Sequence, residues 1–456
     1  MYIKSFLKKF LPKKILNLRH LVLAWYGAYK YGYPSEDLLV IGITGTSGKS
    51  STTHFLRQLL ESAGFKVGSL STIDFYIAGE DKINDQKMTM LGRFQIQKYL
   101  REMVNKGCDI AIVETTSEGA VQYRHRFINY DMMVLTNFYP EHIDSHGSFE
   151  NYKKAKLSIF EYISSLKRKK LLNKKIQIPN AGDRIPKMEF VNADLTETEE
   201  FLQYPFDRKY TFGKNSRDEE LEGSPMQNHF CLFEPRVTER GLEFKIGKTE
   251  FVAPLFGSHN MMNIICAIEI CHALGVDYKT VLKDAVARLK GPAGRIEFIA
   301  EAEPLGFQII VDYAFEPVAI EKLYAVVDKL KPKRVIHVFG STGGGRDIAR
   351  RFTVGEYVGN HADICIITDE DPYDDDPMEI INDVAGAVEK TGKKEGINLF
   401  KILDRTEAIQ KAVDLAQPGD LILLTGKGSE QKIVVKEKMI PWDDRAAARD
   451  AIKRRK

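Results

Sequence analysis

The sequence predicts an α/β fold with two α/β regions, and three observations support this prediction. Short apolar runs typical of buried strands recur along the chain, and helical stretches separate many of them. A glycine-rich loop at residues 42–50 joins the first of these strands to a helix. Between about 170 and 255, glycine, charge and short alternating strands take over, which indicates an antiparallel insertion.

The individual elements follow from apolar runs and helical periodicity. Buried strands are expected at Leu38–Ile43, Ile110–Val113, Met132–Leu135, Ile309–Val311, Val335–Phe339, Ile364–Ile367 and Leu421–Leu424. Helices are expected over Thr53–Leu60, which Gly64 ends, and over Asn260–Leu274. The strands of the insertion are expected at Tyr204–Phe212, His229–Phe233 and Leu242–Ile246. The second α/β region is expected to begin after Gly291–Arg295.

The composition is that of a globular chain with more than one domain. Its 456 residues allow about two to four domains. Because 66 Lys+Arg face 63 Asp+Glu, the net charge is only +3, which argues against a general nucleic-acid-binding surface. We expect a reducing compartment, with neither disulfides nor a zinc site, because the cysteines are scattered and form no Cys-x-x-Cys pair. They are Cys108, Cys231, Cys266, Cys271 and Cys365.

Residues 1–35 combine basic and apolar side chains. The apolar run Leu21–Ala28 is too short to span a membrane, and no small-residue cleavage pattern accompanies it, so a signal peptide is disfavoured. An amphipathic basic helix is predicted by the apolar spacing of Ile3, Phe6, Leu7 and Phe10 between lysines. Two interpretations stay open. The helix packs on its own domain, which we favour, or residues 1–33 make a weak contact with a membrane surface.

The segment Gly42–Ser50 reads GITGTSGKS and lies between a predicted strand and a predicted helix. Backbone N–H groups in such a loop, with a helix N-terminus behind them, form a cradle for phosphate oxygens. Lys49 is expected to reach the terminal phosphates, and the Ser50 hydroxyl to bind Mg²⁺. Ile43 stands where the strict Walker motif has its first glycine. The full Gly-Thr-Ser-Gly-Lys-Ser run nevertheless disfavours the alternative of a glycine-rich turn without a ligand.

This loop resembles the ATP loop of the Mur ligases, the ATP-dependent amino-acid ligases of peptidoglycan synthesis, to which the folylpolyglutamate synthetases are related. Further segments resemble the family in the same order: Val113–Gly119 with Gln122 and Arg124, Leu135–Gly147, Tyr152–Lys156, Gly257–Asn260 with Asn263, Gly294–Glu297, Val311–Ala314 with Pro317, Gly340–Asp347, Thr368–Pro372, Leu424–Glu430 and Asp443–Arg445. The resemblance runs from about residue 39 to 450 and is greatest to the MurE type, the UDP-N-acetylmuramoyl-tripeptide synthetases.

The resemblance implies three parts. Residues 39–296 are expected to form a P-loop central domain with a mostly parallel sheet and an antiparallel insertion. Residues 297–456 are expected to form a Rossmann-like C-terminal domain that binds the incoming amino acid. MurE-type enzymes carry a whole UDP-binding domain before the ATP loop. In this sequence we expect the short helical segment 1–38 in its place.

The implied activity is ATP-dependent amide formation. A carboxylate of a UDP-N-acetylmuramoyl-dipeptide-like acceptor attacks ATP and becomes an acyl phosphate, and the amine of the incoming amino acid then displaces the phosphate. The resemblance places this step in peptidoglycan precursor synthesis in the cytoplasm. It implies a monomer that uses small-molecule substrates and no nucleic acid.

Roles for nucleotide and metal residues come from the same resemblance. Ser50 and Glu114 are expected to hold the Mg²⁺ that bridges the β- and γ-phosphates, and His142 a second Mg²⁺. Lys156 matches a lysine that carries a carbamate formed with CO₂ and so becomes an anionic ligand of the second metal. The catalytic residues are then Lys49, His142 and Lys156. The ATP contacts are Gly45, Thr46, Ser47, Gly48, Lys49, Ser50, Ser51, Asn260, Arg295 and Asp312.

The acceptor is expected at Thr89, Thr116, Ser117, Gln122 and Arg124, and the incoming amino acid at Arg346, Asp371, Pro372, Tyr373, Lys427 and Glu430. Several positions depart from the family pattern. Thr89-Met90-Leu91 replaces Thr-Thr-Pro, and three histidines are replaced by Glu118, Phe315 and Ser429. These departures bear on the uridine contact more than on the ATP chemistry, whose residues are nearly all kept.

The incoming amino acid is expected to be basic, such as L-lysine. Diaminopimelate-adding relatives carry Asp-Asn-Pro-Arg, whose arginine can pair with a distal carboxylate. Here Glu370–Tyr373 lacks that arginine and is followed by Asp374–Asp376, and an acidic pocket suits a side-chain cation. Diaminopimelate is the alternative substrate. In the alternative interpretation, the three aspartates are structural and cap the helix that begins near Pro377.

Two other functions stay open. A Mur-fold ligase could act on a folate, a polyamino acid or a lipid-linked acceptor, or a P-loop protein could bind nucleotide without ligating. Residues 1–35 bear on whether the acceptor carries UDP. Their aromatic side chains are either a stacking platform for uracil, with nearby cations for the diphosphate, or a brace packed on the central domain, which we favour. These aromatics are Trp25, Tyr26, Tyr29, Tyr31 and Tyr33, and the cations are Lys13, Lys14, Arg19 and Lys30.

Overall fold

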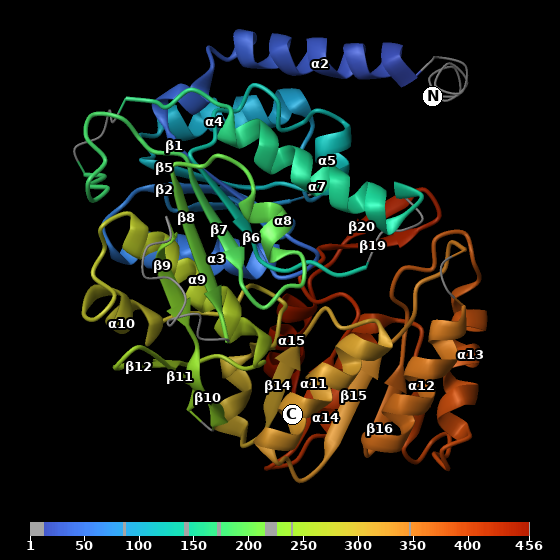
Figure 1. Cartoon of the computed structure of the whole chain (residues 1–456). Helices are drawn as coiled ribbons and strands as arrows, with labels where there is room; N and C mark the ends of the chain where they lie inside the picture. The colour runs from blue at the N-terminus through green and yellow to red at the C-terminus, as the bar shows by residue number, and fades with distance from the viewer. Residues whose placement is uncertain are drawn as a thin grey trace. The chain divides into compact units, whose positions relative to one another are not determined.

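The computed structural model describes residues 13–84, 88–140, 146–170, 175–214, 226–238, 240–345 and 348–455. The chain divides into two compact units. The first contains Met1–Arg236 and Arg240–Lys290, and the second contains Val237–Glu239 and Gly291–Lys456. Figure 1 shows that each unit is built on a twisted sheet covered by helices, which is the α/β class that the sequence predicts.

The sheet of the first unit is mostly parallel. In the described residues its order is β4 (Glu80–Ile83), β3 (Asp74–Ile77), β2 (Val67–Leu70), β5 (Ile110–Glu114), β1 (Leu39–Thr44), β6 (Met132–Leu135), β7 (Met188–Asn192), β8 (Arg208–Gly213) and β9 (Met226–Cys231). Central strand β1 pairs in parallel with β5 and β6. Every residue of β1, β5 and β6 is buried, as expected for strands covered on both faces.

Helices cover both faces of this sheet (Figure 1). One face of β1, with Val40, joins a core with residues of α4, α7 and α8, while α3 packs against α9. Ser148 begins α7 by accepting a hydrogen bond from the Asn151 N–H at 3.1 Å. The helices are α2 (Lys13–Lys30), α3 (Lys49–Ser62), α4 (Arg93–Asn105), α5 (Ser117–Val121), α7 (Phe149–Ser164), α8 (Thr198–Leu202), α9 (His259–Ala273) and α10 (Val281–Val286), with a 3₁₀ turn η1 at Pro34–Asp37.

The predicted antiparallel insertion is smaller than expected. Strands β7, β8 and β9 pair in parallel and continue the main sheet. The antiparallel assignment of Tyr204–Phe212 and His229–Phe233 is therefore wrong. Both strands are short and mix polar with apolar residues, so their periodicity does not indicate the direction of pairing. Antiparallel pairing in the later region joins β11 (Gly241–Ile246) to β12 (Thr249–Ala253), in a small sheet with β10 (Phe233–Thr238).

The second unit has a mostly parallel sheet between two helical layers, with β13 (Glu297–Phe298) pairing antiparallel at its edge. The sheet order is β13, β14 (Gln308–Val311), β18 (Leu421–Leu424), β15 (Val335–Phe339), β16 (Ile364–Ile367) and β17 (Leu399–Lys401). One core joins the sheet to α11 (Pro317–Leu330), α12 (Ala349–His361) and α13 (Pro377–Glu389). The other joins it to α14 (Arg405–Leu415) and α15 (Asp444–Arg454). A hairpin, β19 (Lys432–Val435) and β20 (Lys438–Pro441), and a 3₁₀ helix η2 at Ala300–Leu305 complete the described elements.

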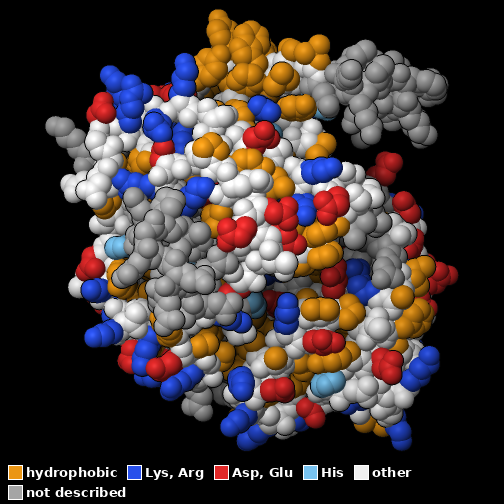
Figure 2. Space-filling model, viewed as in Figure 1, with side chains coloured by type: hydrophobic (Ala, Val, Ile, Leu, Met, Phe, Trp, Pro, Cys, Tyr) orange, Lys and Arg blue, Asp and Glu red, His pale blue; other side chains and the backbone are white. Residues whose placement is uncertain are grey.

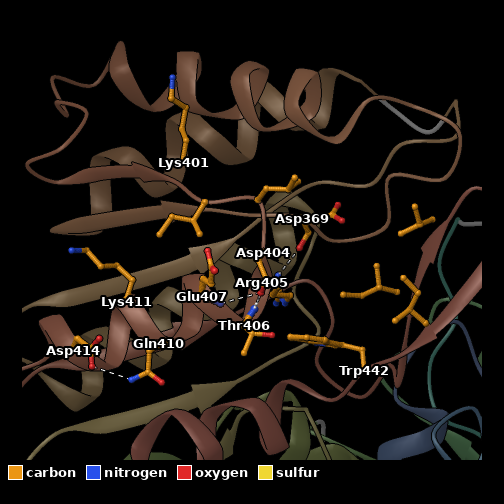
Figure 3. A pocket seen from close by; sticks show the side chains of 15 residues that line it. Asp369, Lys401, Asp404, Arg405, Thr406, Glu407, Gln410, Lys411, Asp414 and Trp442 are labelled. Carbon is orange, nitrogen blue, oxygen red and sulfur yellow. Dashed lines mark hydrogen bonds between the residues drawn. The ribbon is translucent and has the colours of Figure 1, made fainter. Parts of the chain in front are cut away.

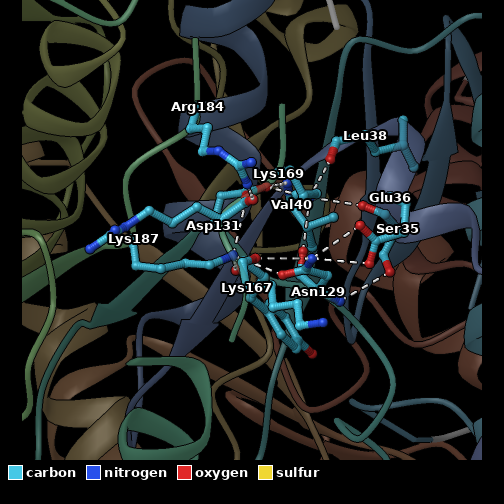
Figure 4. A network of polar contacts seen from close by, with 12 residues as sticks. Ser35, Glu36, Leu38, Val40, Asn129, Asp131, Lys167, Lys169, Arg184 and Lys187 are labelled. Carbon is cyan, nitrogen blue, oxygen red and sulfur yellow. Dashed lines mark hydrogen bonds and ion pairs between the residues drawn. The ribbon is translucent and has the colours of Figure 1, made fainter. Parts of the chain in front are cut away.

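A buried ion cluster fixes the segment between α2 and β1 (Figure 4). The carboxylate of Asp131 accepts the Val40 N–H at 2.9 Å and lies 2.5 Å from Lys169 Nζ and 3.3 Å from Lys187 Nζ. Lys169 also donates to the carbonyl oxygens of Ser35, Leu38 and Asn129. Burial lowers the pKa of Lys187. Since both cations and the carboxylate are buried, removing Asp131 would leave two lysine cations in the core without their shared counter-ion.

Helix α2 packs on α4 through its small residues. Ala24 and Ala28 are buried, and a Cβ at Gly27 would lie 3.4 Å from the Arg93 carbonyl oxygen. The aromatic side chains Trp25 and Tyr29 point away from the body instead, with exposed fractions of 46% and 62%. The expectation that the aromatics of α2 pack on the central domain is therefore wrong for these two residues, because the small residues take up the packed face.

Candidate functional site

The phosphate loop follows β1 and is held by the end of β6. Gly45 has φ 152°, and a Cβ there would lie 2.0 Å from Thr136 Oγ1. Gly48 has φ 77° and begins α3. Asn137 accepts the Ser47 N–H at 2.8 Å and donates to the Ser47 carbonyl at 3.0 Å. Because glycine alone fits both close approaches, the loop can curve around an anion at the N-terminus of α3.

Lys49 and Thr46 lie inside this loop. The ammonium of Lys49 donates to the carbonyl oxygens of Gly45 and Thr46, both at 2.9 Å. The Thr46 hydroxyl lies 2.9 Å from the Tyr152 hydroxyl of α7. The loop therefore carries a cation at its centre and is fixed to a second helix.

Glu114 ends β5 beside the start of α3 and is fully buried. Burial raises the pKa of its carboxyl, while Lys49 and a hydrogen bond from Ser50 act in the opposite direction. Its Oε2 accepts the Thr72 hydroxyl at 3.0 Å, and its Oε1 accepts the Thr72 N–H at 3.2 Å. The Glu114 carboxylate and the Ser50 hydroxyl thus meet at the carboxyl end of β5. Ligands bind at this edge of parallel α/β sheets.

Lys156 of α7 is 1% exposed. Its Nζ donates to the Gly45 carbonyl oxygen at 3.0 Å and lies 3.3 Å from Thr44 Oγ1. It also lies 4.8 Å from the centroid of the Tyr152 ring. Helix α7 therefore turns this side chain toward the phosphate loop and not toward solvent.

A cavity of about 320 Å³ adjoins the phosphate loop. It brings together residues that lie far apart in the sequence, and its lining includes Gly45, Lys49, Thr89, Thr116, Ser117, Arg124 and Lys156. Four of the five predicted acceptor residues are among them. Gln122, the fifth, accepts hydrogen bonds from Arg124 at 3.2 and 2.8 Å and so positions that guanidinium.

Two further residues of this cavity lie in the segments that resemble the family but were given no role from the sequence. His146 lies 3.1 Å from the Ser117 hydroxyl through its Nε2, and Tyr152 contacts both Thr46 and Lys156. Tyr152 is 1% exposed. From the sequence alone, a buried aromatic at a functional site cannot be distinguished from one that only packs in the core. The signal for His146 was its place in the segment Leu135–Gly147.

Asn260 opens α9 close to the phosphate loop. Its Nδ2 donates to the Phe256 carbonyl at 2.9 Å, and its Oδ1 accepts from Asn263 at 3.3 Å. Asn263 in turn accepts the Thr52 hydroxyl at 3.2 Å, and a Cβ at Gly48 would lie 2.7 Å from its Oδ1. The structure therefore places Asn263, rather than Asn260, directly against the loop.

In the second unit, Arg295 and Asp312 lie beside each other. The Asp312 carboxylate accepts the N–H groups of Ile296 at 2.7 Å and Ala314 at 2.8 Å. Burial raises its pKa, and Arg295 opposes that change. The Arg295 guanidinium lies 4.6 Å from the centroid of the Tyr313 ring.

The residues predicted for the incoming amino acid also converge within the second unit. Buried Lys427 lies 3.0 Å from Asp371 and 2.7 Å from Glu430. Tyr373, after Pro372, adopts φ 53° and donates its N–H to the Val434 carbonyl at 3.1 Å. Of the acidic run, Asp376 caps α13 and Asp375 lies 3.3 Å from Arg351. The capping alternative is therefore confirmed for Asp376, while Asp374 is exposed.

Glu370 supplies a pH-dependent prediction. Burial raises its pKa from 4.5 to about 7, although Lys427 and Arg405 oppose the change. The folded state therefore holds a proton that the unfolded state releases, so stability should fall as pH rises from about 4.5 to about 7. We expect Glu370→Gln to flatten this fall in denaturant titrations between those pH values. An unchanged slope would contradict this assignment, and Asp374→Asn is the matched control.

Two predicted residues, His142 and Arg346, lie outside the described residues. Within the described part of the chain, no group of three or more His, Cys, Asp and Glu side chains is arranged to hold a metal ion. Near the loop, the Ser50 hydroxyl and the Glu114 carboxylate are oxygens of the kind that Mg²⁺ prefers, and a hydrogen bond joins them. Mg²⁺ commonly takes few protein ligands and completes its shell with phosphate and water.

A larger hollow of about 890 Å³ lies on the second unit, between α14 and the β19–β20 hairpin (Figure 3). Its walls carry both signs of charge, as Lys411, Glu407 and Asp414 show, and Trp442 forms one side. None of the residues predicted to bind nucleotide, metal or substrate lines it. Volume alone therefore does not make it the reaction site, and the smaller cavity at the phosphate loop is the candidate.

Comparison with known proteins agrees with this geometry. The Mur ligase middle domain matches residues 43–271, and the family described as "Mur ligase, glutamate ligase domain" matches residues 294–428. A UDP-N-acetylmuramyl-tripeptide synthetase of Roseiflexus sp. is 34% identical over 448 residues, which cover 96% of this chain and 83% of the relative. A UDP-N-acetylmuramoyl-L-alanyl-D-glutamate–2,6-diaminopimelate ligase of Clostridium botulinum is 31% identical, covering 94% and 81%.

Among solved structures, a UDP-N-acetylmuramoyl-L-alanyl-D-glutamate–2,6-diaminopimelate ligase superposes with a TM-score of 0.62 at 24% identity. The alignment covers 95% of this chain and 82% of that one, and it supports the fold. Family models, relatives and fold agree over nearly the whole length. The chain belongs to the Mur ligase family, ATP-dependent enzymes that form amide bonds.

Proposed function

We propose that this chain is a MurE-type ligase, which joins an amino acid to a UDP-N-acetylmuramoyl-dipeptide-like acceptor in the cytoplasm. The observation that carries the proposal is the cavity in which Gly45, Lys49 and Lys156 adjoin Thr89 and Arg124. A phosphate-binding loop and an acceptor-binding wall thus line a single cavity, as an acyl-phosphate mechanism requires. The first unit is proposed as the ATP-binding domain and the second as the amino-acid-binding domain.

The proposed reaction has two steps. The acceptor carboxylate attacks the γ-phosphorus of ATP, so that a carboxyl C–O–P bond forms and ADP leaves. The amine of the amino acid then attacks the acyl carbon, loses a proton and expels inorganic phosphate. In the first step Arg124, positioned by Gln122, binds the anionic acceptor, and Lys49 with the loop N–H groups stabilises the charge on the transferred phosphoryl group.

The residues near the loop fit a magnesium site. Ser50 and Glu114 are the proposed ligands, because a hydrogen bond already brings their oxygens together. Bound there, Mg²⁺ would neutralise the phosphate oxygens. Lys156 is proposed to carry a carbamate, since its Nζ is buried, lines the same cavity and lies beside the phosphate loop at Gly45. His142 is proposed as a further ligand, and Asn260, Arg295 and Asp312 as nucleotide contacts.

For the incoming amino acid we propose a basic side chain such as that of L-lysine. The proposal is supported by Tyr373, which stands where a diaminopimelate-binding arginine would be, and by the exposed carboxylate of Asp374. Asp371, Lys427 and Glu430 form the ion cluster that would hold the amino-acid backbone.

A product assay tests the function. The purified chain is incubated with ATP, Mg²⁺, UDP-N-acetylmuramoyl-L-alanyl-D-glutamate and one amino acid from a panel of lysine, ornithine, diaminopimelate, glutamate and alanine. We expect phosphate release and a tripeptide product with lysine or ornithine. Product with diaminopimelate alone would overturn the choice of amino acid. Product only with a folate or lipid-linked acceptor would favour the other ligase, and no acceptor-dependent turnover would favour a nucleotide-binding protein.

Lys49→Ala should weaken nucleotide use severely. The variant loses the cation at the centre of the phosphate loop, and losing one preorganised group at a phosphoryl site costs roughly 3 kcal/mol, about a hundredfold in rate. Isothermal titration with a non-hydrolysable ATP analogue, together with turnover, measures the effect. Lys98→Ala removes an exposed lysine of α4 and serves as the control. Equal affinity and turnover in the two variants would mean that the loop is structural.

A further inference from the structure

The outer face of α2 exposes a continuous stripe of large apolar and aromatic side chains, which we call the α2 stripe. It consists of Leu18, Val22, Trp25, Tyr26 and Tyr29, with exposed fractions of 61%, 50%, 46%, 47% and 62%. Figure 2 shows apolar side chains gathered at the top of the molecule, where α2 runs in Figure 1. Such a contiguous patch marks a surface that is covered by a partner, a ligand or a lipid surface.

The spacing of the stripe is helical. At about 100° per residue, its five side chains fall within an arc of roughly 100°. Ala24 and Ala28, which pack on the body, lie on the opposite side of the helix. The ring planes of Trp25 and Tyr29 are stacked, with centroids 5.8 Å apart and an interplanar angle of 18°. The stripe is therefore a flat aromatic and aliphatic surface rather than a set of scattered exposed residues.

The helix is held so that this face points outward. Its C-terminal end is tied to α4, because Arg101 donates to the carbonyl oxygens of Tyr31 and Gly32, both at 2.8 Å. Tyr26 also contacts the Phe94 ring at 5.5 Å. If α2 rotated about its axis to bury the stripe, it would lose the close approach at Gly27 and these contacts with α4.

The charge of the same region is wholly positive. Residues 1–35 contain seven Lys or Arg and no Asp or Glu, although the whole chain has a net charge of only +3. Arg19 and Lys30 on α2 are exposed. A cationic helix with an aromatic and aliphatic face combines the two features that attract a peptide to anionic lipid, namely electrostatic attraction and burial at the headgroup boundary.

We propose that the α2 stripe rests on the surface of an anionic phospholipid bilayer, with α2 parallel to the membrane plane. Trp25, Tyr26 and Tyr29 lie at the headgroup level, where amphipathic rings are preferred, and the exposed Arg19 and Lys30 face lipid phosphates. The proposed contact is peripheral. In the described part of the chain, no helix has the length and apolar character of a membrane span. The lipid surface explains the charge and the aromatic stripe together, whereas a neutral protein partner would explain the stripe alone.

Vesicle binding tests the proposal on the full chain. Sedimentation with phosphatidylcholine vesicles is compared with sedimentation with vesicles that also contain phosphatidylglycerol, at low and at high salt. We expect binding to the anionic vesicles that weakens with salt, because exposed charges are screened within a Debye length of about 10 Å at 0.1 M. Trp25 and Trp442 are the two tryptophans, so Trp442→Phe leaves Trp25 as the reporter. Its emission should shift to shorter wavelength with anionic vesicles.

Paired variants make the test specific. Trp25→Ser/Tyr29→Ser should lower the affinity for anionic vesicles by about tenfold or more, with the melting temperature unchanged, because both side chains are exposed. Phe352→Ser/Ile397→Ser removes two exposed apolar side chains of the second unit and should bind vesicles as the unmodified chain does. Equal binding to neutral and anionic vesicles, no binding at all, or a dimer that the serine pair dissociates would each overturn the proposal.

Discussion

Replacing Lys156 with alanine should lower amide formation by about a thousandfold, the upper range for one electrostatic group at a reacting centre. ATP affinity should change little, because Lys156 contacts a carbonyl and a hydroxyl oxygen of the loop rather than its N–H donors. The physical reason is its position. A buried lysine in the candidate reaction cavity would either carry its charge there or, as a carbamate, bind metal, and alanine can do neither.

Rescue separates the carbamate from a plain ammonium. Short carboxylates such as acetate should restore part of the activity of Lys156→Ala, because they can occupy the space of the missing group. They should not rescue Lys156→Met, whose side chain fills that space. Lys154→Ala, on the exposed side of the same helix, is the matched control for turnover. Full turnover of Lys156→Ala without additives would exclude Lys156 from the reaction, and rescue by amines instead of carboxylates would exclude the carbamate.

The phosphate loop and most strands were predictable because their signals are local. Met132–Leu135, Val335–Phe339, Ile364–Ile367 and Leu421–Leu424 are strands with the predicted bounds. Three of them are uninterrupted apolar runs, and in Val335–Phe339 only His337 interrupts the run. Burial on both faces of such a strand can be predicted without knowing the partner strand. The Gly-Thr-Ser-Gly-Lys-Ser loop likewise carries its turn, cradle and helix start in adjacent residues.

Features that depend on distant residues were not predictable from such patterns. The burial of Lys156 arises from a contact with Thr44, 112 positions earlier in the chain. The parallel direction of β7, β8 and β9 depends on the crossover connections between them, which the residues of such short strands do not encode. The orientation of α2 was misjudged for a related reason. Trp25 and Tyr29 are apolar enough for a core, but Ala24, Gly27 and Ala28 allow the closer helix contact.

Glu114→Gln should lower turnover by about a thousandfold while leaving the protein as stable as before or more stable. The change removes the carboxylate proposed to bind Mg²⁺ and keeps the shape of the side chain. The expected effect on stability is opposite to the effect on turnover. Burial raises the pKa of Glu114, so the charged form opposes folding increasingly as pH rises above the ordinary value of 4.5. A neutral glutamine removes that cost at neutral pH.

Glu189, a second buried glutamate on the same sheet, provides the control for these opposite effects on turnover and on stability. Glu189 of β7 is buried, and burial raises its pKa to about 8, but it does not line the cavity at the phosphate loop. Glu189→Gln should therefore stabilise the protein at pH 8 and leave turnover and the Mg²⁺ dependence unchanged. Thermal unfolding, turnover and Mg²⁺ titration of both variants give the comparison. If Glu114→Gln lost stability and activity together, Glu114 would be a structural residue, and the magnesium site at the end of β5 would have to be abandoned.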